Sequence, residues 1–199
     1  MARSGACNAW PVDAIYRPGA ISEPAGLRDD VVLLRRWSYD DLGCIEEASR
    51  DPDIVSNTTV PERFSDVEGR AFVDRQWGRA ASGEGVSLAI IEARSGSAAG
   101  LVCLMHRQQP GVVGLGYWIV ASRRGRGLAR DSVVRLSRWA LGLGSVDRLE
   151  ALVDPTNAAS MRVLEGAGFE QEARLRGYFG ADGARSDALL YSLISTDIA

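Results

Sequence analysis

A short run rich in arginine and glycine, residues 124–129 (RGRGLA), is the segment of this chain whose residue types best suit binding chemistry. It lies between an apolar run with strand character and a segment with helical spacing. Gly125 and Gly127 let the backbone turn tightly with its N–H groups uncovered. The first N–H groups of the following helix lack partners inside that helix, and the helix dipole adds partial positive charge there. The pattern therefore predicts an anion site suited to a phosphate or diphosphate.

Four arginines add positive charge around the turn: Arg123, Arg124, Arg126 and Arg130. Other phosphate-binding patterns do not fit. A Walker loop needs Lys followed by Ser or Thr after the second glycine, and neither is present. A dinucleotide fingerprint needs a third glycine where this chain has Arg130. A basic solvated turn ahead of a surface helix stays open as an alternative on this segment alone, because glycine and arginine are common in loops.

The elements that must position this turn follow from the periodicity of apolar residues. Strands are predicted at residues 31–34, 86–93, 98–105, 112–120, 148–153, 169–176 and 188–194. Helices are predicted after Ser38, after Ser65, over residues 133–143 and around residues 161–164. The fold class is therefore α/β (α+β), with a mixed, mostly antiparallel sheet of about seven strands and about four helices. The strand–helix–strand unit that contains the turn predicts one parallel crossover.

Local signals set the boundaries of these helices. Ser38 with Asp41, and Ser65 with Glu68, resemble capping boxes that begin two helices. The Asp51-Pro52 pair is expected to end the first helix.

The length of 199 residues suits one domain with a short extension. Residues 1–28 contain several prolines and glycines without sustained periodicity, so we expect an N-terminal extension there and the domain at residues 29–199. The net charge of −3 provides no bulk attraction to nucleic acid or to an anionic membrane. No signal-peptide core and no apolar stretch of about 20 residues is visible.

The three cysteines are Cys7, Cys44 and Cys103. They show neither metal-ligand spacing nor a disulfide framework, so a reducing cytoplasm and a site without metal are expected.

Two segments together resemble the GNAT N-acetyltransferase superfamily. Arg124-x-x-Gly127-x-Ala129 matches the family's R/Q-x-x-G-x-G/A loop, and residues 116–120 (GYWIV) resemble the strand before it. Residues 154–169 (DPTNAASMRVLEGAGF) resemble the N-x-x-S-x-x-x-x-E-K-x-G-F segment, with Gly166 where Lys is usual. Residues 174–178 and 187–193 resemble the last strands of the ribosomal-protein-alanine acetyltransferase branch. The resemblance covers about residues 31–196.

This resemblance implies an acetyl-CoA-dependent N-acetyltransferase with a V-shaped sheet, in which strands 112–120 and 148–153 run parallel and then part. The diphosphate of coenzyme A would bind the N–H groups of residues 125–130, and the pantetheine would lie between the strands. The implied cofactor-binding residues are Trp118, Ile119, Val120, Arg124, Gly125, Arg126, Gly127, Leu128, Ala129, Arg130 and Asn157. The backbones of Trp118 and Val120 would hold the pantetheine, although both aromatic side chains of the GYW strand also suit a core. Asn157 could instead be a plain helix cap.

The catalytic candidates are less well determined. Ser160 aligns with the family's motif serine and is a candidate proton donor to the leaving thiolate, although a helical serine also bonds its own backbone. Tyr178 and Tyr191 are rival donors, although tyrosines in late strands are more often core residues. Many relatives carry Glu two residues before the glycine of the GYW strand, and this chain has Gly114 there. His106, the only histidine, and Glu150 are the remaining candidate bases.

The absence of a carboxylate at position 114 indicates which kind of amine could be the acceptor. A lysine amine with a pKa of about 10.4 is about 0.1% free base near pH 7.4, a penalty of about 4 kcal/mol, whereas an α-amine with a pKa of about 7.7–8.0 loses under about 1 kcal/mol. We therefore expect a protein or peptide N-terminus as acceptor. A small amine such as an antibiotic or polyamine is an alternative acceptor, and a non-catalytic acyl-CoA-binding module is an alternative function. A homodimer is also left open. A single-stranded nucleic-acid binder is disfavoured, because the arginine-rich run has no interleaved aromatics.

Overall fold

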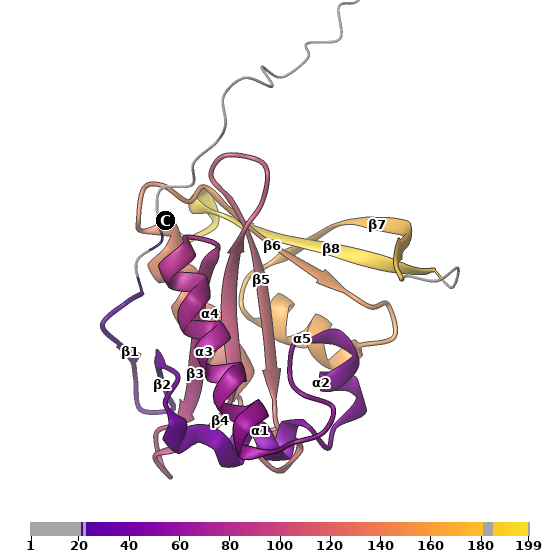
Figure 1. Cartoon of the computed structure of the whole chain (residues 1–199). Helices are drawn as coiled ribbons and strands as arrows, with labels where there is room; N and C mark the ends of the chain where they lie inside the picture. Colours follow the sequence, from indigo (N-terminus) through magenta and orange to yellow (C-terminus); the bar gives the residue numbers. More distant parts are fainter. Residues whose placement is uncertain (1–20, 22, 181–184, 199) are drawn as a thin grey trace, which may run out of the picture.

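Eight strands form one mixed sheet in the part of the chain that the computed structural model describes, residues 21, 23–180 and 185–198 (Figure 1). The strand order is β1-β2-β3-β4-β5-β6-β8-β7. All neighbouring pairs are antiparallel except β5 and β6, which are parallel. The strands are β1 (Leu27–Arg28), β2 (Val32–Arg36), β3 (Gly85–Glu92), β4 (Ser97–His106), β5 (Val112–Ile119), β6 (Arg148–Val153), β7 (Glu170–Phe179) and β8 (Ser186–Ile194).

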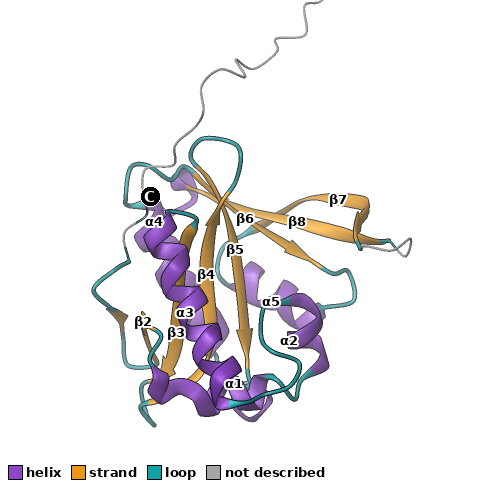
Figure 2. Cartoon of the chain, in the orientation of Figure 1, coloured by secondary structure: helices purple, strands orange, loops and turns teal. Residues whose placement is uncertain are grey.

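Helices pack against both faces of this sheet (Figure 2). The α-helices over the described residues are α1 (Leu42–Ala48), α2 (Pro52–Asn57), α3 (Asp66–Ser82), α4 (Leu128–Leu141) and α5 (Ala158–Gly166). Short 3-10 turns are η1 (Tyr39–Asp41), η2 (Ala121–Arg123) and η3 (Ser195–Ile198). Side chains of α1, α2 and α3 join one buried cluster, and side chains of α4 and α5 join the other. The sheet therefore has a hydrophobic core on each face.

Each core is assembled from amphipathic helices with recognisable starts. Ser65 caps α3 by accepting a hydrogen bond from the Glu68 amide, and Phe72 of α3 packs edge-on against Trp37 at 5.4 Å between ring centroids. On the other face, Val133 and Leu136 of α4 are fully buried against the sheet. Apolar residues three to four positions apart produce this single buried stripe.

The parallel strands β5 and β6 are paired only at one end. Their register covers Val112–Gly114 against Arg148–Glu150, and no pairing follows beyond Gly114. β5 continues its pairing with β4 as far as Ile119, and β6 pairs along its whole length with β8. The two strands therefore diverge toward their carboxyl ends, as Figure 1 shows. This confirms the expected V-shaped parting of the sheet.

The structure confirms the expected mixed sheet and adds two elements to the predicted order. The first is α2: Asp51 and Pro52 do not simply end the preceding helix, because the Asp51 side chain accepts a hydrogen bond from the Asp53 amide and Pro52 begins a new helix. Proline is well suited to a first helical position, where its missing N–H has no partner to lose. The second is the two-residue edge strand β1, which was too short to show a period.

The described part of the predicted extension contacts the domain. Ile21 is buried in the core beneath α4, and Leu27 and Arg28 pair with β2. Gly180-Ala181-Asp182-Gly183 suits a turn between the last two predicted strands, and residues 181–184 lie outside the described residues. None of the helices in the described ranges is both long and apolar enough to span a membrane.

Replacing the fully buried Leu136 with alanine is expected to lower the free energy of unfolding by about 2–5 kcal/mol, because α4 would leave a cavity against the sheet. Urea denaturation measures this change. The matched control is Val67→Ala in α3, whose residue is 74% exposed and whose loss should cost less than about 0.5 kcal/mol. Equal stability of the two variants would show that α4 does not seal this core.

Candidate active site

The predicted anion-binding turn connects the open end of β5 to α4. After β5, the chain passes through η2 and reaches Gly125 and Gly127, which have φ angles of 74° and 79°. These left-handed conformations are accessible to glycine without steric cost. Gly127 is the N-cap of α4 and provides no capping side chain. Leu128 is buried in the core beneath, which fixes the first turn of the helix.

Six consecutive amides are left without partners at this turn. Throughout the described part of the chain, no backbone or side-chain acceptor is found for the N–H groups of residues 125–130. The first α4 amide with an acceptor is that of Asp131, which donates to the Gly127 carbonyl at 3.1 Å. Unpaired donors at a helix N-terminus, in a glycine turn exposed to solvent, fit a diphosphate. No side chain among the described residues caps these amides, so they remain available to an anion.

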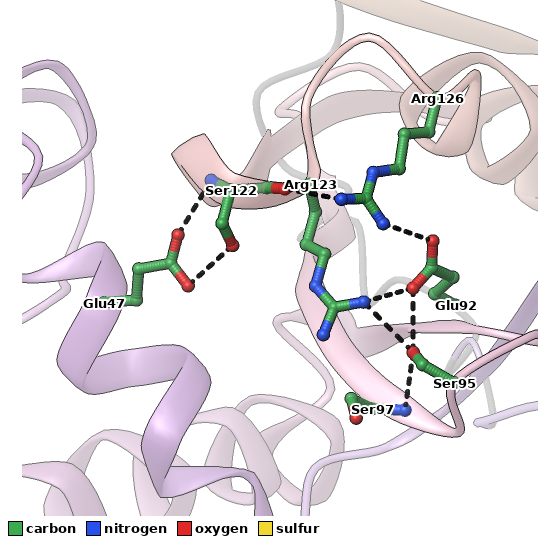
Figure 3. Close-up of polar contacts among 7 residues, drawn as sticks. All are labelled: Glu47, Glu92, Ser95, Ser97, Ser122, Arg123 and Arg126. Atoms are coloured by element: carbon green, nitrogen blue, oxygen red, sulfur yellow. Dashed lines mark hydrogen bonds and ion pairs between the residues drawn. The ribbon is translucent and has the colours of Figure 1, made fainter.

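A buried carboxylate anchors the turn from β3. Glu92 is 7% exposed and forms ion pairs with Arg123 and Arg126, the latter at 3.0 Å (Figure 3). The Ser95 hydroxyl donates to the same carboxylate at 2.8 Å. The hydrogen bond from Ser95, together with the two arginines, lowers the pKa of Glu92. Glu92 therefore stays ionised and ties both arginines to the end of the β3–β4 hairpin.

Two further carboxylates hold the turn from the opposite side. Glu47 of α1 accepts hydrogen bonds from the Ser122 amide and hydroxyl, both at 2.9 Å (Figure 3). Asp51, the N-cap of α2, forms an ion pair with Arg124, whose Nε also donates to the Ile119 carbonyl at 3.0 Å. The arginine charges are thus largely compensated within the protein. The amides, rather than the guanidinium groups, are the unpaired donors.

Arg130 has a different environment from the other three arginines. Its guanidinium pairs with the neighbouring Asp131 at 3.1 Å. A Cβ atom added at Gly166 would lie 3.3 Å from the Arg130 stem, so this stem runs past the place where relatives carry lysine.

The backbone edge that β5 presents to the opening differs from the expected one. The Val120 amide donates to the Ala99 carbonyl at 2.9 Å, and the Trp118 carbonyl is directed at Gly100 of β4. Because peptide groups alternate along a strand, Tyr117 and Ile119 are the residues whose backbone faces β6. The expectation that Trp118 and Val120 present free backbone groups is therefore corrected by one residue. Their side chains, with that of Trp37, belong to the core under α1–α3.

Two hydroxyl side chains meet across the opening. Ser160 lies in the first turn of α5, and its Oγ is 2.7 Å from the Tyr117 hydroxyl of β5. Asn157 caps α5 by accepting a hydrogen bond from the Ser160 amide at 2.9 Å. The capping role of Asn157 is thus observed, and its side-chain nitrogen has no partner within the described residues. Tyr117, which the sequence indicated only as a core aromatic, joins the site.

The other two candidate catalytic residues lie apart from Ser160. His106 is the last residue of β4 and pairs with Val113, about 17 Å along the sheet from Trp118 at 3.3 Å per residue. Its ring nitrogens are buried without partners among the described residues, and burial lowers its pKa. Glu150 lies opposite Gly114, the last β5 residue that pairs with β6, and forms an ion pair with Arg148 at 2.8 Å. The structure therefore brings neither residue next to the Tyr117–Ser160 pair.

The position of the absent carboxylate is occupied by a cation. A Cβ atom added at Gly114 would lie 2.5 Å from Nη2 of Arg107, so the guanidinium covers this glycine. Across the described residues, the Arg107 side chain makes no hydrogen bond or ion pair. A search of those residues also finds no cluster of three His, Cys, Asp or Glu side chains that would hold a metal ion.

Comparison with known proteins agrees with this geometry. A family model described as an acetyltransferase (GNAT) domain matches residues 32–170, more than half of the chain. The uncharacterized N-acetyltransferase p20 of Bacillus licheniformis is 25% identical over 170 residues, which cover 84% of this chain and 95% of that protein.

Two solved structures share the fold at lower sequence identity. The ribosomal L7/L12 alpha-N-protein acetyltransferase in complex with coenzyme A is 18% identical, with a TM-score of 0.72 over 85% of this chain and 97% of that one. The Microcin C7 self-immunity acetyltransferase in complex with acetyl-CoA and AMP is 17% identical, with a TM-score of 0.73 over 83% of this chain and 93% of that one.

Replacing Gly127 with alanine is expected to weaken coenzyme A binding about tenfold. An L-residue in the left-handed conformation costs about 1–2 kcal/mol, so the turn would adopt its binding conformation less often. Calorimetric titration with coenzyme A measures the effect. Gly78→Ala in α3 is the control, because Gly78 has open space around it and no positive φ. An unchanged affinity in Gly127→Ala would contradict the assignment of this turn.

Proposed function

Because the chain belongs to the GNAT acetyltransferase family and is an acetyl-CoA-dependent N-acetyltransferase, we propose that its acceptor is the α-amine of a protein or peptide. The observation that carries the cosubstrate assignment is the row of six unpaired amides at the start of α4. The observation that carries the acceptor assignment is the absence of an amine-activating carboxylate from the Gly114 position, which Arg107 covers.

Different groups of the protein would bind different parts of the cosubstrate. The amides of residues 125–130 would hold the diphosphate, and the backbone of Tyr117 and Ile119 would face the pantetheine between the strands. Asn157, with its free side-chain nitrogen, lies at the same opening. When bound, acetyl-CoA supplies the acetyl group as a thioester. The Ile119 amide faces the opening and is the donor best placed to stabilise negative charge on the carbonyl oxygen.

Ser160 would provide the proton that the departing sulfur needs. Its hydroxyl lies at the parting of the strands, on the first turn of α5, and is half-buried. As Ser160 gives its proton to sulfur and the carbon–sulfur bond breaks, it would recover a proton, directly or through solvent, from the positively charged nitrogen of the tetrahedral intermediate. The products are then the neutral amide and the coenzyme A thiol. This assignment leaves deprotonation of the amine to solvent before the amine binds.

Because no protein group would deprotonate the amine, the site favours an acceptor amine that is already neutral. His106 and Glu150 form no hydrogen bond with Tyr117 or Ser160, and Arg107 covers Gly114, the position where the family resemblance leads one to expect a carboxylate. A cation at that position disfavours an ammonium ion and leaves a neutral amine unaffected. The likeness to the alpha-N-protein acetyltransferase supports a protein N-terminus. The likeness to the self-immunity enzyme keeps a small-molecule amine as the second candidate.

Two peptides of one sequence provide a direct test at neutral pH. One carries a free N-terminus and arginine in place of lysine, and the other carries a blocked N-terminus and one lysine. We expect kcat/KM to be at least about 100-fold higher for the first, since the free-base fractions differ by over two pKa units. A preference for the lysine peptide would refute the proposal, and turnover only on polyamines or aminoglycosides would support the second candidate. Coenzyme A binding with no turnover on any amine would indicate a non-catalytic module.

The pH profile of kcat/KM tests the unassisted amine independently. With the α-amine peptide, the rate should rise with pH and level off above about 7.7–8.0, where the acceptor itself becomes neutral. A lysine acceptor would continue to rise toward about pH 10.4. A plateau that begins well below the acceptor pKa would reveal a protein base and contradict the proposal.

Cytoplasmic location and a homodimer remain predictions.

A further inference from the structure

We propose that Tyr117 is a positioning residue that holds the Ser160 hydroxyl with its proton directed into the opening between β5 and β6. The inference rests on the proposed function, since it assigns Ser160 the task of protonating the departing sulfur. It adds a residue whose side chain the sequence indicated only as a core aromatic and that lies on a different element from Ser160.

The contact spans the two arms of the V. Tyr117 extends from β5 toward the face that carries α4 and α5, where its ring packs against the core. Its hydroxyl lies 2.7 Å from Ser160 Oγ and 3.2 Å from the Ser160 carbonyl oxygen, across 43 residues of sequence. One phenol therefore reaches both oxygens of the same serine.

Either hydroxyl of this pair can donate, and we assign the donor role to Tyr117. The phenol has one proton, and burial raises the pKa of Tyr117 to about 12, although the hydrogen bond with Ser160 opposes part of this rise. The phenol therefore stays protonated at neutral pH, and its one proton has two acceptors, Ser160 Oγ at 2.7 Å and the Ser160 carbonyl oxygen at 3.2 Å. We assign this proton to Oγ, the nearer of the two. With its oxygen acting as acceptor, Ser160 keeps its own proton for a third group.

The alternative fate of Ser160 shows why a positioning group is needed. A serine in the first turn of a helix, left alone, turns its hydroxyl toward the backbone carbonyls of the preceding turn. That orientation would direct the Ser160 proton into its own helix instead of the opening. The hydrogen bond from Tyr117 competes with it.

Tyr191 provides a matched control. It is a fully buried tyrosine on β8 that also connects the sheet to α5, since its hydroxyl donates to Glu165 of α5 at 3.1 Å and lies 3.2 Å from Gln171 of β7. It does not contact Ser160. Removing its hydroxyl therefore tests the loss of a sheet-to-α5 hydrogen bond without disturbing the serine.

The experiment compares Tyr117→Phe, Ser160→Ala, the double variant and Tyr191→Phe. We expect Ser160→Ala to lower kcat about 100-fold, within the usual range for loss of a general acid, and Tyr117→Phe about tenfold. The double variant should be no slower than Ser160→Ala, because a residue that acts through Ser160 has nothing to position once the hydroxyl is gone. The KM for acetyl-CoA and the Kd for coenzyme A should change less than about threefold.

A readout independent of turnover is the pKa of the thiol of bound coenzyme A, followed by thiolate absorbance. A hydroxyl that donates to sulfur stabilises the thiolate, so this pKa should rise in Ser160→Ala and in Tyr117→Phe, and stay unchanged in Tyr191→Phe. The inference is overturned if Tyr117→Phe matches Tyr191→Phe in kcat and thiol pKa, if the two losses in kcat multiply in the double variant, or if Ser160→Ala keeps the parent rate. In these outcomes the parent protein still acetylates amines, whereas a parent that binds no coenzyme A or acetylates no amine refutes the proposed function itself.

Discussion

The parting of β5 and β6 beyond Gly114 is the constraint on which the candidate site depends. Each strand is paired along its other edge, β5 with β4 and β6 with β8, so the twist of the two half-sheets draws them apart. A continued parallel ladder would consume the backbone groups of Tyr117 and Ile119, and it would close the opening that Ser160 faces. The unpaired edge has a free-energy cost, because backbone groups require partners. Arg124 Nε offsets part of it by donating to the Ile119 carbonyl.

The turn between β5 and α4 holds one conformation although six of its amides have no hydrogen-bond partner among the described residues. Within the described ranges no side chain caps the amides of residues 125–130, so the turn is fixed through its own side chains instead. Glu92, Glu47 and Asp51 reach it from β3, α1 and the start of α2. These contacts would be weak as isolated surface pairs. Glu92 is largely buried and shared by two arginines, which makes it the strongest of the three anchors and leaves the amides pre-organised for an anion.

Local patterns predicted the parts of the site that depend on backbone conformation, and missed those that depend on long-range contact. The glycines of the turn, the capping Asn157 and the helical stripe of α4 are all visible within a few residues. Glu47, Asp51 and Glu92 contact the turn from 31 to 75 residues away, and nothing in their own neighbourhoods marks them. The free backbone edge was placed one residue wrong, because strand alternation fixes its direction only once the register with β4 is known.

At Gly114 the chain lacks the carboxylate that the family resemblance leads one to expect, and a positive charge lies there instead. Gly114 leaves room directly over β5, and the Arg107 guanidinium fills it. A carboxylate at this place would attract an ammonium ion and assist its deprotonation, whereas a guanidinium favours the neutral form of any amine beside it. Under the proposed function, selectivity would then follow from the acceptor's own pKa, because only a weakly basic amine is substantially neutral near pH 7. The acceptor would thus provide its own free base, and Ser160 on α5 would be the proton donor that the protein holds in place.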